Sequence, residues 1–150
     1  MPGSWRSRVS VAGPRVLALL WAAYDASRAI AYIDSSPPQL AAVAVWLPLW
    51  IPWTIATVLL LLGGMVPPRA GCQSQQAARL MRQWGMTLTT SLLLIWATAF
   101  FVSDFHRGWV TAGSYLMLVA FSGWSGWVAS RDVADVRAVR EEVISAGMDE

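Results

Sequence analysis

The stretch that decides the fold is LAAVAVWLPLWIPWTIATVLLLLGGMV, from Leu40 to Val66, which is 27 residues without a single charge. As a helix rising 1.5 Å per residue it would extend about 40 Å. The hydrocarbon core of a bilayer is only about 30 Å thick. The stretch therefore predicts a membrane protein, and the rest of the chain is interpreted as membrane topology.

The composition agrees with a membrane protein. The 150 residues are 56% hydrophobic and 13% charged, and they include 10 Trp residues, a type that favours membrane interfaces. A net charge of +2 does not suggest nucleic-acid binding. The lone Cys72 excludes an internal disulfide and a cysteine metal cluster within one chain. All basic residues except the histidine are Arg, which points to a GC-rich genome such as that of an actinobacterium or its phage.

Four apolar segments predict an all-α, four-transmembrane-helix bundle built from two hairpins, with spans at about 16–33, 40–66, 84–102 and 109–129. Residues 1–15 form a basic N-terminus. Residues 130–150 form an amphipathic tail, with a helix expected over 131–146. The first span is the weakest because Asp25 and Arg28 interrupt it. A rival interpretation takes this segment as a cleaved signal peptide.

The arginines set the expected orientation. Nine of them lie in the N-terminus, the 67–83 link and the tail, whereas the two short turns hold only Arg107. Because basic segments stay on the cytoplasmic side, both termini are expected to face the cytoplasm of a cell membrane.

The two hairpins resemble each other. Leu20-Trp21-Ala22 corresponds to Ile95-Trp96-Ala97 at an offset of 75 residues, and Trp50-x-x-Trp53 corresponds to Trp124-x-x-Trp127 at an offset of 74. An internal duplication is one explanation, and chance matches in a Trp-rich chain are the other. Repeats of this kind occur in transporters.

Asp25 and Arg28 are the only ionisable pair inside a predicted span. Three residues apart on a helix, they share a face and are expected to form an intramembrane ion pair. One interpretation is a proton or ion relay, or a pairing site for another subunit. The other is a self-neutralised pair near the outer interface, with Arg28 reaching toward water.

Three further features concern helix shape and packing. Pro48 and Pro52 predict a bend in the second span. Ser122 and Gly126 form a small-residue face suited to helix packing, within the chain or between copies. The expected interfacial or lipid-facing aromatics are Trp46, Trp50, Trp53, Trp124 and Trp127.

Chemistry-bearing residues are sparse. Thr87, Ser91 and Thr98 could line a polar path, although such hydroxyls more often bond to their own helix. His106 is the only histidine, in a turn. No catalytic motif or metal-ligand spacing appears. We therefore expect no enzyme activity, no cofactor and no metal.

The profile predicts a small protein that acts by assembly in the membrane. A holin-like protein, or an accessory or anchoring subunit of a larger membrane complex, would have this profile. The expected partners are the lipid bilayer and other membrane proteins, including copies of the same chain, and not nucleic acid. The alternative is a small dimeric transporter or channel that uses Asp25 and Arg28.

Overall fold

The fold is all-helical in the computed structural model, which describes residues 4–34, 37–40, 47–67, 71–103 and 108–146. These residues contain four α-helices, one 3-10 turn and no strand. In chain order the elements are α1 (Ser4–Ala31), η1 (Pro38–Leu40), α3 (Trp50–Met65), α4 (Cys72–Ser103) and α5 (Gly108–Ala146).

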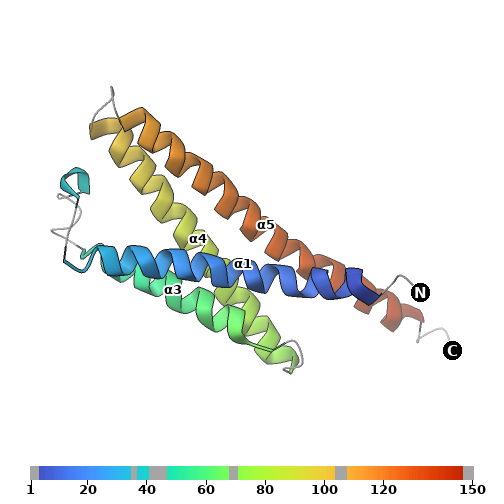
Figure 1. The fold of residues 1–150 in the computed structure, drawn as a ribbon. Coiled ribbons are helices and arrows are strands. Elements are labelled where there is room, and N and C mark those ends of the chain that lie inside the picture. The colour runs from blue at the N-terminus through green and yellow to red at the C-terminus, as the bar shows by residue number, and fades with distance from the viewer. Residues whose placement is uncertain (1–3, 35–36, 41–46, 68–70, 104–107, 147–150) are drawn as a thin grey trace.

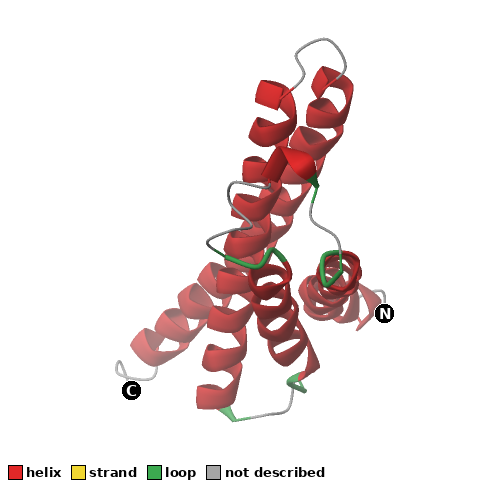
Figure 2. Ribbon diagram, turned by 90° about the vertical axis from the view of Figure 1, so that its left-hand side faces the viewer, coloured by secondary structure: helices red, strands yellow, loops and turns green. Residues whose placement is uncertain are grey.

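Helices that follow one another in the chain pack side by side. Helix α1 lies along α3, α3 packs against α4, and α4 and α5 form a long hairpin (Figure 1). Helix α1 also touches both α4 and α5. The view in Figure 2, turned by 90°, shows the hairpin of α4 and α5 almost upright, with α1 seen nearly end-on beside it. Helices α1, α4 and α5 are therefore all in contact with one another.

The decisive stretch does not form one helix, which corrects the predicted span of 40–66. Leu40 ends the η1 turn, residues 41–46 lie outside the described ranges, and α3 begins only at Trp50. Its 16 residues extend about 24 Å. Pro48 therefore precedes the helix, and Pro52 lies in its first turn, where the missing N–H has no helical partner to lose. The predicted proline bend is wrong, because neither proline lies in a helix interior.

The other three helices are longer than predicted. Helix α1 begins at Ser4, α4 begins at Cys72, and α5 continues to Ala146 without a break where a separate tail helix was expected. Arginine and glutamine are good helix formers, so polar segments that resemble links can extend a neighbouring helix. Judged by length and composition alone, only α4 among the described helices, over Gln73–Ser103, is long and apolar enough to cross a membrane.

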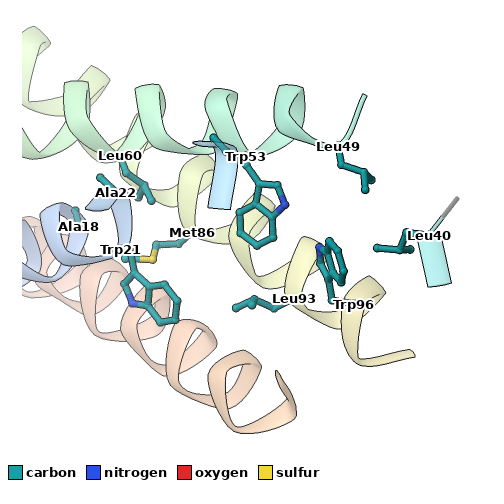
Figure 3. Packing of buried hydrophobic residues seen from close by; sticks show 11 residues of the cluster. Ala18, Trp21, Ala22, Leu40, Leu49, Trp53, Leu60, Met86, Leu93 and Trp96 are labelled. Carbon is teal, nitrogen blue, oxygen red and sulfur yellow. The ribbon is translucent and has the colours of Figure 1, made fainter. Parts of the chain in front are cut away.

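The buried core is made mostly of tryptophan, leucine and alanine. Trp53 of α3 and Trp96 of α4 point toward the same space from facing helices, whereas the ring of Trp21 of α1 points toward α5 (Figure 3). Trp96 stacks on Tyr32 with ring centroids 4.9 Å apart. Large aromatic rings thus fill much of the space between these helices.

Two glycines allow the helices to approach closely. A Cβ added to Gly63 of α3 would lie 2.6 Å from Cγ of Arg82 and 2.8 Å from the carbonyl oxygen of Ala78, both on α4. A Cβ added to Gly85 of α4 would lie 2.7 Å from Cγ of Leu60 on α3. The contact between α3 and α4 therefore depends on the absence of side chains at these two positions.

Large apolar side chains are exposed on every described helix. Leu20 of α1 is 62% exposed, Met65 of α3 is 72%, Val102 of α4 is 77% and Met117 of α5 is 76%. The buried residues include several polar ones: Asp25, Thr57, Arg82, Thr89, Ser122 and Ser125. Soluble monomers rarely expose so many large apolar side chains together.

The burial pattern fits the first half of the sequence repeat fully and the second half in part. Trp21 and Trp96 are both buried, as are the alanines that follow them, while Leu20 is exposed like its counterpart in α4. In the other match, Trp50 and Trp124 are both exposed, but Trp53 is buried whereas Trp127 is half exposed. The correspondence in burial is therefore complete only between α1 and α4.

Candidate functional site

A ring of hydrogen-bonded polar side chains joins α1, α4 and α5 inside the bundle. Each helix contributes two residues, and each contact joins a different pair of helices. We call this set the polar ring; its members are Trp21 and Asp25 of α1, Thr89 and Thr90 of α4, and Ser122 and Ser125 of α5.

Three contacts close the ring. Thr89 forms a hydrogen bond of 2.6 Å with Oδ2 of Asp25. The hydroxyls of Thr90 and Ser122 lie 2.9 Å apart. Nε1 of Trp21 donates to the hydroxyl of Ser125 at 3.3 Å. Because each bond requires one rotation and one register of its two helices, the ring specifies how α1, α4 and α5 sit against one another.

Asp25 is the only ionisable member of the ring. Its side chain is fully buried, and Oδ1 has no hydrogen-bond partner within the described structure. A buried polar atom without a partner is rare in folded proteins and marks a position that needs an explanation. Asp25 is therefore the candidate functional residue of the bundle.

The predicted ion pair between Asp25 and Arg28 does not form, which corrects that assignment. Nε of Arg28 donates instead to the hydroxyl of Tyr24 at 3.2 Å. The guanidinium also lies 5.1 Å from the ring centroid of Tyr24 and 5.7 Å from that of Tyr115 on α5. Such cation–π contacts stabilise a cation that is partly removed from water. Tyr24 is four residues from Arg28 and competes with the carboxylate, which α1 turns toward α4.

The small-residue face of α5 packs within the chain. Ser122 contacts Thr90 of α4, and a Cβ on Gly126 would lie 3.6 Å from Cβ of Met86, also on α4. Outside this contact is a groove of about 380 Å³ between α4 and α5. Its lining combines hydroxyl and small residues with apolar ones: Gln83, Met86, Thr87, Thr90, Ser91, Leu94, Ser122, Gly123, Gly126 and Trp127.

The hydroxyls predicted along the third span remain bonded to their own helix. Thr87 donates to the carbonyl oxygen of Gln83, Ser91 to that of Thr87, and Thr98 to that of Leu94, each at 2.9 Å. All three side chains are exposed on α4. They form a satisfied stripe on the outside of the bundle, and Thr89 and Thr90 on the inner side make the contacts between helices.

The expected lipid-facing tryptophans do not all lie on the surface. Trp50, Trp124 and Trp127 are exposed. Trp53 is only 1% exposed and packs edge-on against Tyr24, with ring centroids 6.2 Å apart. The prediction for Trp53 is wrong because that side of α3 faces α1. Trp46 lies outside the described residues, as does His106.

Two arginines bond to the C-terminal end of α3, a feature that the sequence did not reveal. Nη1 of Arg82 donates to the carbonyl oxygen of Gly63 at 2.7 Å, and Arg15 of α1 donates to that of Val66. The last carbonyls of a helix lack helical partners and carry partial negative charge. The only feature of the sequence that hints at these contacts is that Gly63-Gly64 lies between two segments that carry arginines. These contacts join α1, α3 and α4 at one end of the bundle.

The polar ring lacks the ligands of a metal centre. No group of three or more His, Cys, Asp or Glu side chains gathers anywhere in the part of the chain that the structure describes. The ring offers one carboxyl group, four hydroxyls and one indole N–H. Such a set can fix helix packing and can bind or release a proton at Asp25.

A double-mutant cycle between Thr90→Val and Ser122→Ala should measure the energy of one contact in the ring. We expect a coupling of about 0.5–1.5 kcal/mol, the net contribution of a typical hydrogen bond inside a protein. The readout is the free energy of unfolding in detergent micelles. Thr98→Val with Ser122→Ala is the matched control, because Thr98 bonds only to Leu94 of its own helix. Equal coupling in both cycles would contradict a direct bond between α4 and α5.

Comparison with protein families, curated proteins and solved structures finds no match to this chain.

Proposed function

We propose that this chain is an integral protein of the cell membrane whose four helices all cross the bilayer, with both termini in the cytoplasm. The observation that carries the proposal is the exposure of large apolar side chains on every helix, while Asp25, Thr89 and Ser125 are buried inside. In water this arrangement would expose a large apolar surface and bury polar groups at a cost. In lipid the exposed apolar side chains meet hydrocarbon, which they favour. The buried polar groups bond to one another across helices.

The separate spans differ in how well they fit this proposal. Helix α4 is long enough alone, whereas α3 extends about 24 Å and is short for a hydrocarbon core of about 30 Å. A short span is accommodated by local thinning of the bilayer or by oligomerisation. Exposed Trp50 at the start of α3 and Trp109 at the start of α5 are suitably placed to anchor the bundle at one interface.

The function that we propose is assembly with a second copy of the chain in the membrane. The groove between α4 and α5 supports this function because Thr87, Ser91 and Gly123 line it. A Cβ added to Gly123 would have no atom within 4 Å, so space is open there. Small and hydroxyl residues allow a second helix to approach closely, whereas lipid chains gain little from them. A holin-like pore and a subunit of a larger membrane complex are both versions of this function.

Disulfide trapping tests the assembly. In a Cys72→Ser background, Gly123→Cys places a thiol in the groove, and Leu20→Cys places one on the exposed face of α1 as the matched control. We expect oxidation in membranes to link Gly123→Cys chains into dimers while Leu20→Cys chains remain monomers. Monomers from both variants, together with a monomeric mass in mild detergent and harmless expression in a host cell, would reject assembly and its holin-like version.

The second candidate function is a small dimeric transporter or channel that uses Asp25. It is favoured by the fully buried carboxyl group at the contact of three helices. Arg28 no longer belongs to this hypothesis as a partner of Asp25, because it bonds to Tyr24. Proton flux into liposomes should then stop with Asp25→Asn and persist with Asp34→Asn, a change at an exposed aspartate.

A further inference from the structure

We propose that Asp25 is a proton-binding site, and that in the closed bundle it is a neutral carboxylic acid whose Oδ2–H donates to Thr89. This inference goes beyond the proposed assembly and needs no second copy of the chain. It rests on three observations at one place: complete burial, an oxygen without a partner, and two short contacts to a single hydroxyl.

The first argument is the environment of the carboxyl group. An ionised carboxylate without a cation is very costly in an apolar interior, and such groups become neutral instead. Arg28 on α1 binds Tyr24 of the same helix and lies over the ring of Tyr115 on α5, and it makes no contact with Asp25. On α4 the nearest charge is Arg82, two turns from Thr89 and bonded to Gly63. The described part of α3 carries no ionisable side chain. No cation in the described structure therefore compensates a charge on Asp25.

The second argument is the count of hydrogens around Thr89. Its Oγ1 lies 2.6 Å from Oδ2 of Asp25 and 3.0 Å from the carbonyl oxygen of Gly85. Both partners are acceptors when Asp25 is ionised, and a threonine hydroxyl has one hydrogen to donate. A protonated Asp25 supplies the second hydrogen. The chain is then Asp25 Oδ2–H to Thr89 Oγ1, and Thr89 O–H to Gly85 O, so both contacts are satisfied.

The third argument concerns Oδ1. In the neutral acid this atom is the carbonyl oxygen, and leaving it without a partner costs far less than leaving half of a carboxylate without one. A bound metal cation would fit less well. Ca²⁺ takes six to eight oxygen ligands, and here the described side chains supply only one carboxyl and one hydroxyl. The proton is the ligand that the geometry accommodates.

Release of this proton requires water to reach the ring. The reaction is R–COOH + H₂O → R–COO⁻ + H₃O⁺, and water must both accept the proton and solvate the carboxylate. Asp25 is fully buried and bonds to Thr89 of α4, so water reaches the carboxyl group only when the helices around it move apart. Proton binding at Asp25 therefore favours the closed contact between α1 and α4, and proton release favours its opening.

Infrared spectroscopy of the full chain in detergent micelles tests the protonation state directly. At neutral pH we expect the C=O stretch of a carboxylic acid, shifted in ²H₂O, which disappears in Asp25→Asn. Thr89→Val should raise its frequency by removing the hydrogen bond, and Thr89→Ser should leave it unchanged. Because Asp25 and Thr89 belong to one chain, the measurement does not depend on assembly, and failure of the assembly does not affect it.

A second measurement covers the case in which Asp25→Asn does not fold. Wild-type chain labelled with ¹³C at the aspartate carboxyl carbon should show the same acid band at a lower frequency, because the heavier carbon slows the stretch. A chain with the same label and the exposed Asp34 replaced, Asp34→Asn, should keep this acid band and serves as the control. A labelled spectrum that contains only carboxylate bands would overturn the proposal.

Discussion

Replacing Gly63 with alanine is expected to destabilise the bundle by about 1–3 kcal/mol, the usual effect of inserting a methyl group into a close-packed contact. The new Cβ would lie 2.6 Å from Cγ of Arg82 and 2.8 Å from the carbonyl oxygen of Ala78. The Arg82 side chain can rotate, but the carbonyl of Ala78 moves only if α4 moves. Rotation of Arg82 would also break its 2.7 Å hydrogen bond to the carbonyl oxygen of Gly63.

The matched control is Gly113→Ala on α5, where an added Cβ meets no atom within 4 Å. Alanine there should be neutral or stabilising by up to about 1 kcal/mol, because it is the better helix former. Both variants are compared by their free energies of unfolding in micelles. If the two substitutions had equal effects, the close contact between α3 and α4 at Gly63 would not exist.

The same contact shows how far the sequence could predict the structure. Hydrophobic runs located α4 and the apolar parts of α1, α3 and α5, because a run of about 20 apolar residues is informative by itself. They did not locate helix ends. The polarity of residues 73–83 predicts a link between two spans. These residues include good helix formers, and in the structure they extend α4. The sequence predicts both prolines inside a helix, because nothing in the apolar run indicates that the helix begins at Trp50.

The candidate site was predicted only in part. Asp25 stood out because it is a charge inside an apolar segment, and this signal needs no tertiary structure. Its partner was wrong, since spacing alone could not decide whether Arg28 would bond to the carboxylate or to Tyr24. The contacts of Thr89 and Ser125 depend on the rotation of α4 and α5 about their axes. Large apolar residues lie on the exposed faces of these two helices as well as in the core, so the hydrophobic pattern does not set that rotation.

An arginine at the centre of α3 should prevent the protein from folding correctly in the membrane. Val58 is 46% exposed and lies midway along Trp50–Met65. If its surroundings are hydrocarbon, Val58→Arg costs about 3 kcal/mol on insertion scales. If they are water, a surface substitution of this kind changes stability by no more than about 0.5 kcal/mol. The two environments thus predict results that differ severalfold.

Met65→Arg provides the depth control on the same helix. Met65 is 72% exposed, but it is the last residue of α3, at the end where Arg15 and Arg82 already bond to helix carbonyls. A long arginine side chain at a span end reaches the headgroups, so we expect a loss well under 1 kcal/mol there. The fraction of chain inserted in membranes and the free energy of unfolding measure both variants. A large loss of stability for Val58→Arg with a small loss for Met65→Arg requires a bilayer around α3. In water the cost of an exposed arginine would not depend on its position along the helix. Equal small losses would place α3 in water and reject the membrane bundle.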